Sequence, residues 1–329
     1  MNGTMTDHKQ KIIEELDVLR RISVTETAGV FKARTYAAAI KTLTGLAAVR
    51  TVEDLPLATK GDGLGKEVRA KIAKIIADGS LEISPEVRAR ATALDVVQKI
   101  YGVGPKKAED LIAAGYTTIA QIRAAVANKT LKLNRNQLVG LQYYEDINSR
   151  IPRSEMDQHA ALLMAAKPAS LEGVIVGSYR RGRPDSGDID MLIRTSGSTV
   201  DAGAALTDYV AALKTAGYIK EVLAQGEHKC MAICDLGEGT GRRLDLLVTP
   251  PAEFPFAVFY FTGSDIFNVA VRSHALSRGF TLNEHGITQV SSGRAVSGVK
   301  TERDIFSLLK LQWREPTDRT GPDRVTMIA

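Results

Sequence analysis

The sequence predicts an α+β protein in which helices come first and strands come later. In the first half, apolar residues recur at helical spacing among charged ones, as in residues 12–19, 37–46 and 68–76. After about residue 170, short apolar runs at 173–176, 189–193 and 244–248 indicate strands, and 201–215 has the pattern of a helix crossing between two of them. This order predicts a mixed sheet with packed helices, followed at 314–322 by a polar, loop-like tail.

Length and charge narrow the class of protein. The 329 residues are enough for two domains or a few subdomains. A net charge of +5 and a pI of about 9.1 suit a polyanionic partner, although an ordinary basic soluble protein fits them equally well. The sequence lacks an apolar signal core at its start and any run near the ~20 apolar residues that span a bilayer. We therefore expect a soluble, intracellular protein with no membrane partner.

The two cysteines, Cys230 and Cys234, follow His228 closely and could suggest a metal clip. A structural zinc site needs four ligands, and no second His/Cys cluster is present to complete one. The spacing instead predicts buried cysteines on a strand in a reducing compartment.

Two short glycine turns interrupt the helical half. Glycine permits a tight turn, and the helix that follows offers free backbone N–H groups to a phosphate. Either turn alone fits any helix–helix connection, but two of them flanked by lysines predict a module that grips a nucleic-acid backbone without reading sequence. The residues concerned are Gly63, Gly65 and Lys66 in the first turn, and Gly102, Gly104, Lys106 and Lys107 in the second.

Three aspartates form the candidate metal site. Asp188 and Asp190 are two residues apart and would share one face of a strand, while Ile189 and Met191 face the core. Asp245 interrupts an apolar strand, where a lone carboxylate is costly unless it is paired or metal-bound. Three such acids can hold two Mg²⁺ ions, although a bare Asp-x-Asp also occurs in solvated hairpins.

A glycine–serine turn precedes these acids. Gly177 and Ser178 follow a strand and are expected to open a helix whose N–H groups, with the Ser178 hydroxyl, could hold a triphosphate. Arg181 lies just downstream and could neutralise phosphate charge. This combination favours nucleotidyl transfer over the solvated hairpin.

These motifs resemble those of the family X DNA polymerases. Gly-Ser-Tyr-Arg-Arg-Gly at 177–182 with Gly-Asp-Ile-Asp at 187–190 resembles the nucleotidyltransferase signature of the family, and 260–268 resembles the nucleotide-pocket motif of its beta-like members. Further matches make the likeness collinear over nearly the whole chain. It implies four parts, which are a lyase-like helical domain with the first helix-hairpin-helix at 1–83, a DNA-binding subdomain with the second at 84–150, a catalytic palm at 151–257 and a nucleotide-selecting subdomain at 258–329.

The resemblance also implies a role for each matching residue. Asp188, Asp190 and Asp245 match the metal-binding triad, and Asp245 matches the acid that accepts the primer hydroxyl proton. Taken alone, the aromatic residues could be ordinary core side chains and Arg272 a surface cation. The other matches are triphosphate contacts at Gly177, Ser178, Arg181 and Gly187, a supporting Arg150, a ribose-excluding segment at Tyr260 and Phe261, a cis peptide after Gly263, base and sugar contacts at Asp265 and Asn268, and the template-side Arg272.

A second activity is implied for the amino-terminal part. The family often carries a 5′-deoxyribose phosphate lyase that uses a lysine amine to form a Schiff base. Lys71 matches that nucleophile, and Lys32 and Tyr36 match pocket residues. A surface lysine is an almost equally good interpretation of Lys71, because the pocket has lost positive charge. The departures are Phe31 for a histidine, Glu67 and Ile83 for lysines, and Ala70 for a glutamate.

The leading hypothesis is thus a template-directed repair polymerase that is a monomer and acts on gapped or nicked duplex DNA with deoxynucleoside triphosphates. It would use two Mg²⁺ ions, with Mn²⁺ as a substitute, and Na⁺ or K⁺ is a candidate at the helix-hairpin-helix turns. Untemplated transfer, an inactive DNA-binding scaffold and a small-molecule nucleotidyltransferase are the alternatives. Arg272 disfavours the first, the intact triad the second, and the two hairpins the third. The expected location is the nucleus of a eukaryote, or otherwise the cytoplasm or a virion.

Overall fold

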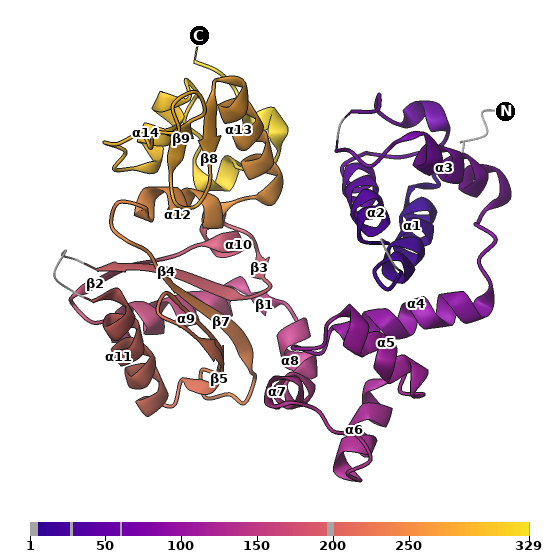
Figure 1. Cartoon of the computed structure of the whole chain (residues 1–329), viewed down its shortest axis with the longest axis horizontal. Coiled ribbons are helices and arrows are strands. Elements are labelled where there is room, and N and C mark those ends of the chain that lie inside the picture. The colour runs from indigo at the N-terminus through magenta and orange to yellow at the C-terminus, as the bar shows by residue number, and fades with distance from the viewer. Residues whose placement is uncertain (1–5, 27–28, 60, 196–200, 329) are drawn as a thin grey trace. The chain divides into compact units, whose positions relative to one another are not determined.

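The computed structural model describes residues 6–26, 29–59, 61–195 and 201–328. The chain divides into two compact units, Met1–Tyr144 and Glu145–Ala329. All regular elements in the described part of the first unit are helical, whereas the second unit is built on a sheet (Figure 1). The helices of the first unit are α1 (Lys9–Ser23), α2 (Gly29–Thr44), η1 (Val52–Asp54), α3 (Lys66–Asp78), α4 (Pro85–Gln98), α5 (Pro105–Ala113), α6 (Ile119–Ala127) and α7 (Arg135–Gln142), with α8 (Tyr144–Asn148) at the boundary.

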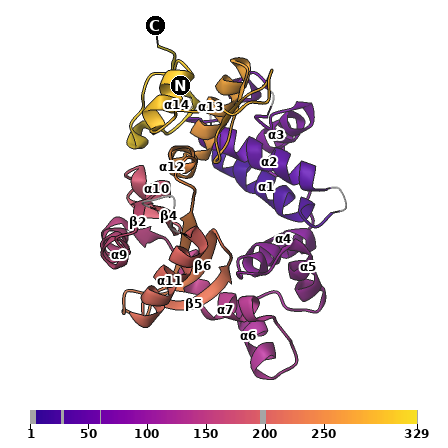
Figure 2. The same cartoon turned by 60° about the vertical axis from the view of Figure 1, so that its left-hand side comes forward.

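Two separate apolar cores stabilise this unit. Figures 1 and 2 show α1, α2 and α3 side by side, and their apolar faces share one core. A second core joins α4 to α7, where capping boxes at Thr118 and Asn134 fix the starts of α6 and α7. The first core includes Ile12, Leu16, Leu43, Leu64, Ile72 and Ile75, and the second includes Leu94, Val97, Leu111, Ile122 and Leu141.

The second unit contains a mixed five-stranded sheet. Its strand order is β2-β4-β7-β6-β5, in which β4 and β7 are parallel and the other neighbours antiparallel. Strands β1 and β3 form a separate antiparallel pair. The strands are β1 (Ile151–Pro152), β2 (Leu171–Ile175), β3 (Asp185–Ser186), β4 (Ile189–Thr195), β5 (Ile219–Gln225), β6 (Lys229–Cys234) and β7 (Arg242–Val248).

The two faces of this sheet pack against different helices. One face, which carries Ile189, Met191 and Ile193, shares a core with α9 (Arg153–Ala166) and α11 (Ala202–Thr215). On the opposite face, Leu192 packs with Ala257 of α12 (Phe254–Thr262). Because strand side chains alternate, the residues at 190 and 245 lie on this second face, beside α12 and the short α10 (Gly177–Arg180).

The carboxyl-terminal part of the unit has its own core. It contains α13 (Asp265–Ser277), the hairpin of β8 (Phe280–Leu282) and β9 (Ile287–Gln289), α14 (Glu302–Leu308), and the turns η2 (Pro316–Asp318) and η3 (Pro322–Arg324). The expectation of a merely polar, loop-like tail at 314–322 was wrong in one respect, because the Arg319 side chain is fully buried.

The α+β class is confirmed, and each predicted strand and helix coincides with an observed one. Cys230 and Cys234 are buried on β6, as expected. Strand β5 was not predicted, because residues 219–225 show only a weak alternation of charged and apolar residues. The four-part domain boundaries stay a prediction, since the division found falls after Tyr144. No helix in the described ranges is long and apolar enough to cross a membrane.

Candidate active site

Two of the three predicted acids are paired where β4 and β7 run parallel, and the third lies just before β4. Asp190 and Asp245 are direct register partners in neighbouring strands, so their side chains point to the same face of the sheet. Asp188 lies just before β4, which begins at Ile189, and not within the strand as the sequence pattern implied. Residues 55 positions apart in the chain are therefore brought together by strand pairing alone.

The electrostatics of this cluster favour a bound cation. Burial, together with the neighbouring charges of Asp188 and Asp245, raises the pKa of Asp190 to about 7. Arg243 and Lys229 oppose that shift in pKa but do not cancel it. A carboxyl group that is half-protonated near neutral pH releases its proton to water when a divalent ion binds to it. Metal ions and protons therefore compete for this group.

Basic side chains hold the two outer acids. Arg243 Nη2 pairs with Asp188 Oδ2, and Lys229 Nζ lies 2.8 Å from Asp245 Oδ2. Within the described residues, no group of three or more His, Cys, Asp or Glu side chains is gathered closely enough to hold a metal ion as it stands. The carboxylates are thus neighbours, but each outer one is turned toward a counter-cation.

The donor set nevertheless fits magnesium. Carboxylate oxygens are the hard ligands that Mg²⁺ takes, and it commonly binds through one or two carboxylates with substrate phosphates completing its shell. The side chains of Arg243 and Lys229 are 38% and 44% exposed, so both ion pairs are open to solvent on one side.

The turn at Gly177 brings backbone close to Asp190. Gly177 has φ of +62° and begins α10, as expected. A Cβ at this position would lie 2.8 Å from Asp190 Oδ2, so only glycine allows the approach. Ser178 Oγ donates a hydrogen bond to Ser186 Oγ at 2.8 Å, which anchors the turn to β3.

Two further predicted contacts lie on that side of the site. Arg150 pairs with Asp185 on β3, with Nη2 to Oδ1 at 2.6 Å. A Cβ on Gly187 would lie 3.1 Å from Arg150 Nη1, so the two predicted residues are adjacent. Arg150 is therefore ion-paired with the Asp185 carboxylate, and its side chain is still exposed beside the turn.

A cavity of about 420 Å³ lies next to α12 and α13. The Gly263–Ser264 peptide at its edge is cis, as the resemblance implied. Asn268 Nδ2 donates to Tyr260 O at 2.7 Å, whereas its Oδ1 is buried and has no hydrogen-bond partner among the described residues. The cavity is lined by Arg181, Tyr260, Phe261, Gly263, Asp265, Asn268, Val269 and Arg272, which include seven residues predicted from the sequence.

Arg181 is held at the edge of this cavity. Its Nη1 donates to Thr262 O at 2.6 Å, and burial lowers its pKa from the ordinary value of arginine. An arginine keeps its charge despite such a shift, so Arg181 presents a partly desolvated cation that suits a phosphate group.

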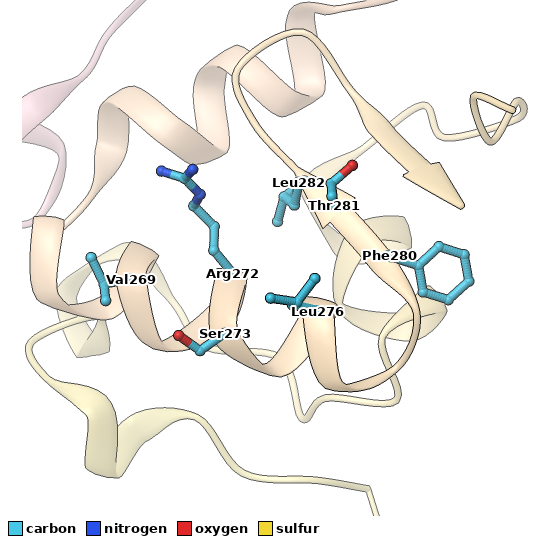
Figure 3. A pocket seen from close by; sticks show the side chains of 7 residues that line it. All are labelled: Val269, Arg272, Ser273, Leu276, Phe280, Thr281 and Leu282. Carbon is cyan, nitrogen blue, oxygen red and sulfur yellow. The ribbon is translucent and has the colours of Figure 1, made fainter. Parts of the chain in front are cut away.

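Arg272 also faces a second hollow. Figure 3 shows Val269, Arg272 and Leu276 along one face of α13, across from β8. These side chains border a cavity of about 390 Å³, and Val269 and Arg272 line both cavities. The template-side role that the resemblance implies for Arg272 stays a prediction.

Sequence reasoning missed a buried ion network beneath the cavity. Glu302 binds Arg319 Nη1 and Arg180 Nη2, each at 2.6 Å, and Arg180 Nη1 donates to Thr262 Oγ1 at 2.6 Å. Burial lowers the pKa of Arg319 from its ordinary value, and the charge of Glu302 offsets only part of that shift. The aromatic rings of Phe259, Phe306 and Trp313 surround Arg319. Nothing in the local pattern marked these charges as buried.

The predicted lyase residues are only partly brought together. Lys32, Tyr36 and Lys66 line a cavity of about 350 Å³ between α2 and α3, together with Phe31 and Glu67. Burial, with a smaller contribution from Glu67, raises the pKa of Tyr36. Lys71 is half-buried on α3 but is not among the residues that line this cavity.

Both glycine turns lead directly into helices. Gly65 is the N-cap of α3, and Gly104 is the N-cap of α5. Gly63 has φ of +75°, and a Cβ there would lie 2.2 Å from the backbone nitrogen of Ala39, so glycine is required for α2 to pack against the turn. Lys66, Lys106 and Lys107 occupy the first turns of these helices, as expected for phosphate contacts.

Comparison with known protein families covers most of the second unit and part of the first. Residues 96–148 match the model for the fingers domain of DNA polymerase lambda, 150–251 match the DNA polymerase beta palm, and 257–320 match the DNA polymerase beta thumb. The three matches follow one another in the order of the chain, and the palm match contains the whole aspartate cluster.

Individual relatives agree with these matches. DNA polymerase lambda of Rattus norvegicus is 29% identical over 335 residues, which cover 95% of this chain and 56% of the relative. DNA polymerase lambda of Arabidopsis thaliana is 30% identical over 282 residues, covering 78% and 52% respectively. The chain thus spans about half the length of these relatives. With the matched modules in the same order along the fold, the chain belongs to the beta-like members of the family X DNA polymerases.

Proposed function

We propose that this chain is a template-directed DNA polymerase that fills short gaps in DNA repair. The observation that carries this proposal is the parallel register of β4 and β7, which makes Asp190 and Asp245 partners on one face of the sheet. Gapped or nicked duplex DNA and deoxynucleoside triphosphates are the proposed substrates. The proposed active form is a monomer, in the nucleus if the source is eukaryotic and otherwise in the cytoplasm or a virion.

The proposed reaction joins a nucleotide to a primer. The primer 3′-hydroxyl oxygen attacks the α-phosphorus, the bond to the β-phosphate oxygen breaks, and pyrophosphate leaves. Asp245 accepts the hydroxyl proton. Asp188, Asp190 and Asp245 would hold two Mg²⁺ ions, with Mn²⁺ as a substitute, and such ions supply Lewis acidity at the attacking and leaving oxygens.

The other site residues bind and orient the nucleotide. The Gly177–Ser178 turn, Arg181 and the Arg150–Gly187 corner would hold the triphosphate. Asp265 and Asn268, which line the cavity, would contact the base and sugar. Tyr260 and Phe261, whose rings meet edge to face, would occupy the space that a ribose 2′-hydroxyl needs. Positioning of this kind contributes much of the catalysis in phosphoryl transfer.

The two glycine turns of the first unit would bind the DNA backbone. Their N-capping glycines leave backbone N–H groups free at the starts of α3 and α5, beside lysines. Na⁺ or K⁺ is the proposed ion at these turns. Contacts of this kind carry no sequence information, which suits an enzyme that must act on any gap.

Primer extension on one-nucleotide-gapped DNA tests this function. With Mg²⁺ and each deoxynucleotide offered separately, we expect only the nucleotide complementary to the template to be added, and no extension in the presence of a chelator. Extension by all four nucleotides would instead favour untemplated transfer. No extension under any of these conditions would favour the inactive scaffold.

A lyase reaction at Lys71 is a second proposed activity. The cavity beside α2 and α3 supports it, with Lys32 and Tyr36 in its wall. The reaction would join Lys71 Nζ to the C1′ aldehyde carbon with loss of water, and β-elimination would then release the 5′-phosphate strand. Glu67 in the cavity wall opposes phosphate capture, so we expect this activity to be weak.

Borohydride trapping measures the lyase step directly. We expect Lys71→Ala to reduce trapping to a 5′-deoxyribose phosphate end by roughly tenfold or more, because the Schiff base requires that amine. Lys74→Ala is the matched control, since Lys74 is an exposed lysine on the same helix that pairs with Asp78 and Glu82. Trapping that persists in Lys71→Ala would identify another amine as the nucleophile.

A further inference from the structure

Lys229 on β6 lies beside the acid at the centre of the proposed chemistry. Met231 is the register partner of Asp245 across the antiparallel β6–β7 pair, and Lys229 lies two residues before Met231 on the same face. It is therefore the diagonal neighbour of Asp245, a position from which a long side chain reaches across. Lys229 Nζ lies 2.8 Å from Asp245 Oδ2.

The two partners of this ion pair differ in exposure. The Lys229 side chain is 44% exposed, whereas that of Asp245 is 16% exposed. An ammonium group on a flexible stem is strongly hydrated and can return to water at small cost. The aspartate is confined to its strand, so any rearrangement of the pair must move the lysine.

A divalent ion and the Lys229 ammonium group repel each other if both contact Asp245 Oδ2. An ion at the usual ~2.1 Å from Oδ2 would lie about 5 Å or less from Nζ, where like charges repel appreciably in a half-exposed site. The pair occupies Asp245 Oδ2, and among the described residues no group of three or more His, Cys, Asp or Glu forms a preformed metal cluster.

We propose that Lys229 is a positioning residue that holds Asp245 Oδ2 in the metal-free protein and is displaced when a divalent ion binds. This inference rests on the proposed function, because it takes Asp245 as a metal ligand. Lys229 thereby neutralises the charge of the largely buried Asp245 carboxylate, and it sets the metal concentration at which the site assembles.

Arg243 and Asp188 form a similar pair, but it is less suited to this role. The Arg243 Nε atom is buried and has no hydrogen-bond partner among the described residues, so part of the guanidinium is confined by packing. Asp188 is also the more exposed acid, at 31%, and water can stabilise it if the pair opens. Lys229 is the freer cation next to the more enclosed carboxylate.

Metal binding without substrates tests the proposal apart from catalysis. Free Mn²⁺ is measured by electron paramagnetic resonance during titration of the full chain without DNA or nucleotide. For Lys229→Gln and Lys229→Met, we expect a dissociation constant about three- to tenfold lower than for the unaltered chain, because one repelling charge is gone. Lys229→Arg should bind Mn²⁺ with nearly the original affinity.

Two controls separate the possible failures. Lys220→Gln removes a similar lysine from the neighbouring strand β5, where it pairs loosely with Asp235, and should leave Mn²⁺ binding unchanged. Asp245→Asn should weaken binding; if it does not, Asp245 is not a ligand and the proposed function itself fails. If Asp245→Asn weakens binding but both charge-removing variants of Lys229 bind as the unaltered chain does, the role of Lys229 is overturned and the proposed function stands.

Discussion

Replacing Asp190 or Asp245 by asparagine should lower nucleotide incorporation by about three orders of magnitude or more. Each change removes a negative charge where divalent ions would bind but keeps nearly the same side-chain size. The loss of several kcal/mol of transition-state charge stabilisation accounts for an effect of this size. For Asp245 the variant also removes the group proposed to accept the primer hydroxyl proton, so its effect should be at least as large.

Single-turnover incorporation on gapped DNA measures this loss, and fluorescence anisotropy measures DNA affinity in parallel. DNA affinity should change little, because the proposed backbone contacts lie at the glycine turns of the first unit. Asp208→Asn is the matched control, since Asp208 is exposed on α11 and takes no part in the site. If either active-site variant extended primers at the original rate, the assignment of the triad would be wrong.

Replacing Glu302 by glutamine should destabilise the second unit by about 3 kcal/mol, because it leaves a buried arginine without its counter-charge. Glu302 binds Arg319, whose side chain is fully buried, and Arg180, which is partly buried. An exposed ion pair would contribute less than about 1 kcal/mol. The free energy of unfolding should therefore distinguish this pair clearly from those on the surface.

Urea unfolding followed by fluorescence gives that free energy. Trp313 is the only tryptophan in the sequence, and its ring lies 5.0 Å from Phe306 and from the Arg319 guanidinium, so its emission reports on this region. Glu172→Gln is the control, because Glu172 pairs with Arg194 across the exposed edge of β2 and β4. A Glu302→Gln chain as stable as this control would contradict the prediction.

A double variant tests the physical reason for the effect. Glu302→Gln combined with Arg319→Met removes the buried charge along with its partner, and should recover part of the lost stability. Equal or greater loss in the double variant would mean that packing of Arg319 against the aromatic rings, rather than charge pairing, dominates.

Much of the fold could be predicted because its signals are local. The apolar spacing in α3, the alternation of β4 and the apolar run of β7 each identify an element within a few residues. Strand β5 could not be predicted, because its pattern of burial depends on pairing with β6 and contains two register shifts. Its neighbours in the sheet, rather than its own composition, make it a strand.

The nucleotide cavity could be predicted only through resemblance. The motif at 260–268 supplied five of the seven predicted residues that line the cavity, and Arg181 and Arg272 came from other matches. Physical patterns alone did not distinguish Tyr260 and Phe261 from core aromatics. The lyase assignment stays a prediction, because Lys71 does not line the cavity that Lys32 and Tyr36 border.

The sequence by itself indicated the three acids, because two aspartates at this spacing suit one face of a strand and a lone carboxylate in an apolar strand is costly, although Asp188 lies just before β4. Only the tertiary structure decided which cations those acids meet. Lys229 reaches Asp245 through the β6–β7 register, and Arg319 is buried by rings from distant segments. Charge pairing depends on distances between side chains remote in the sequence, and folding alone sets those distances.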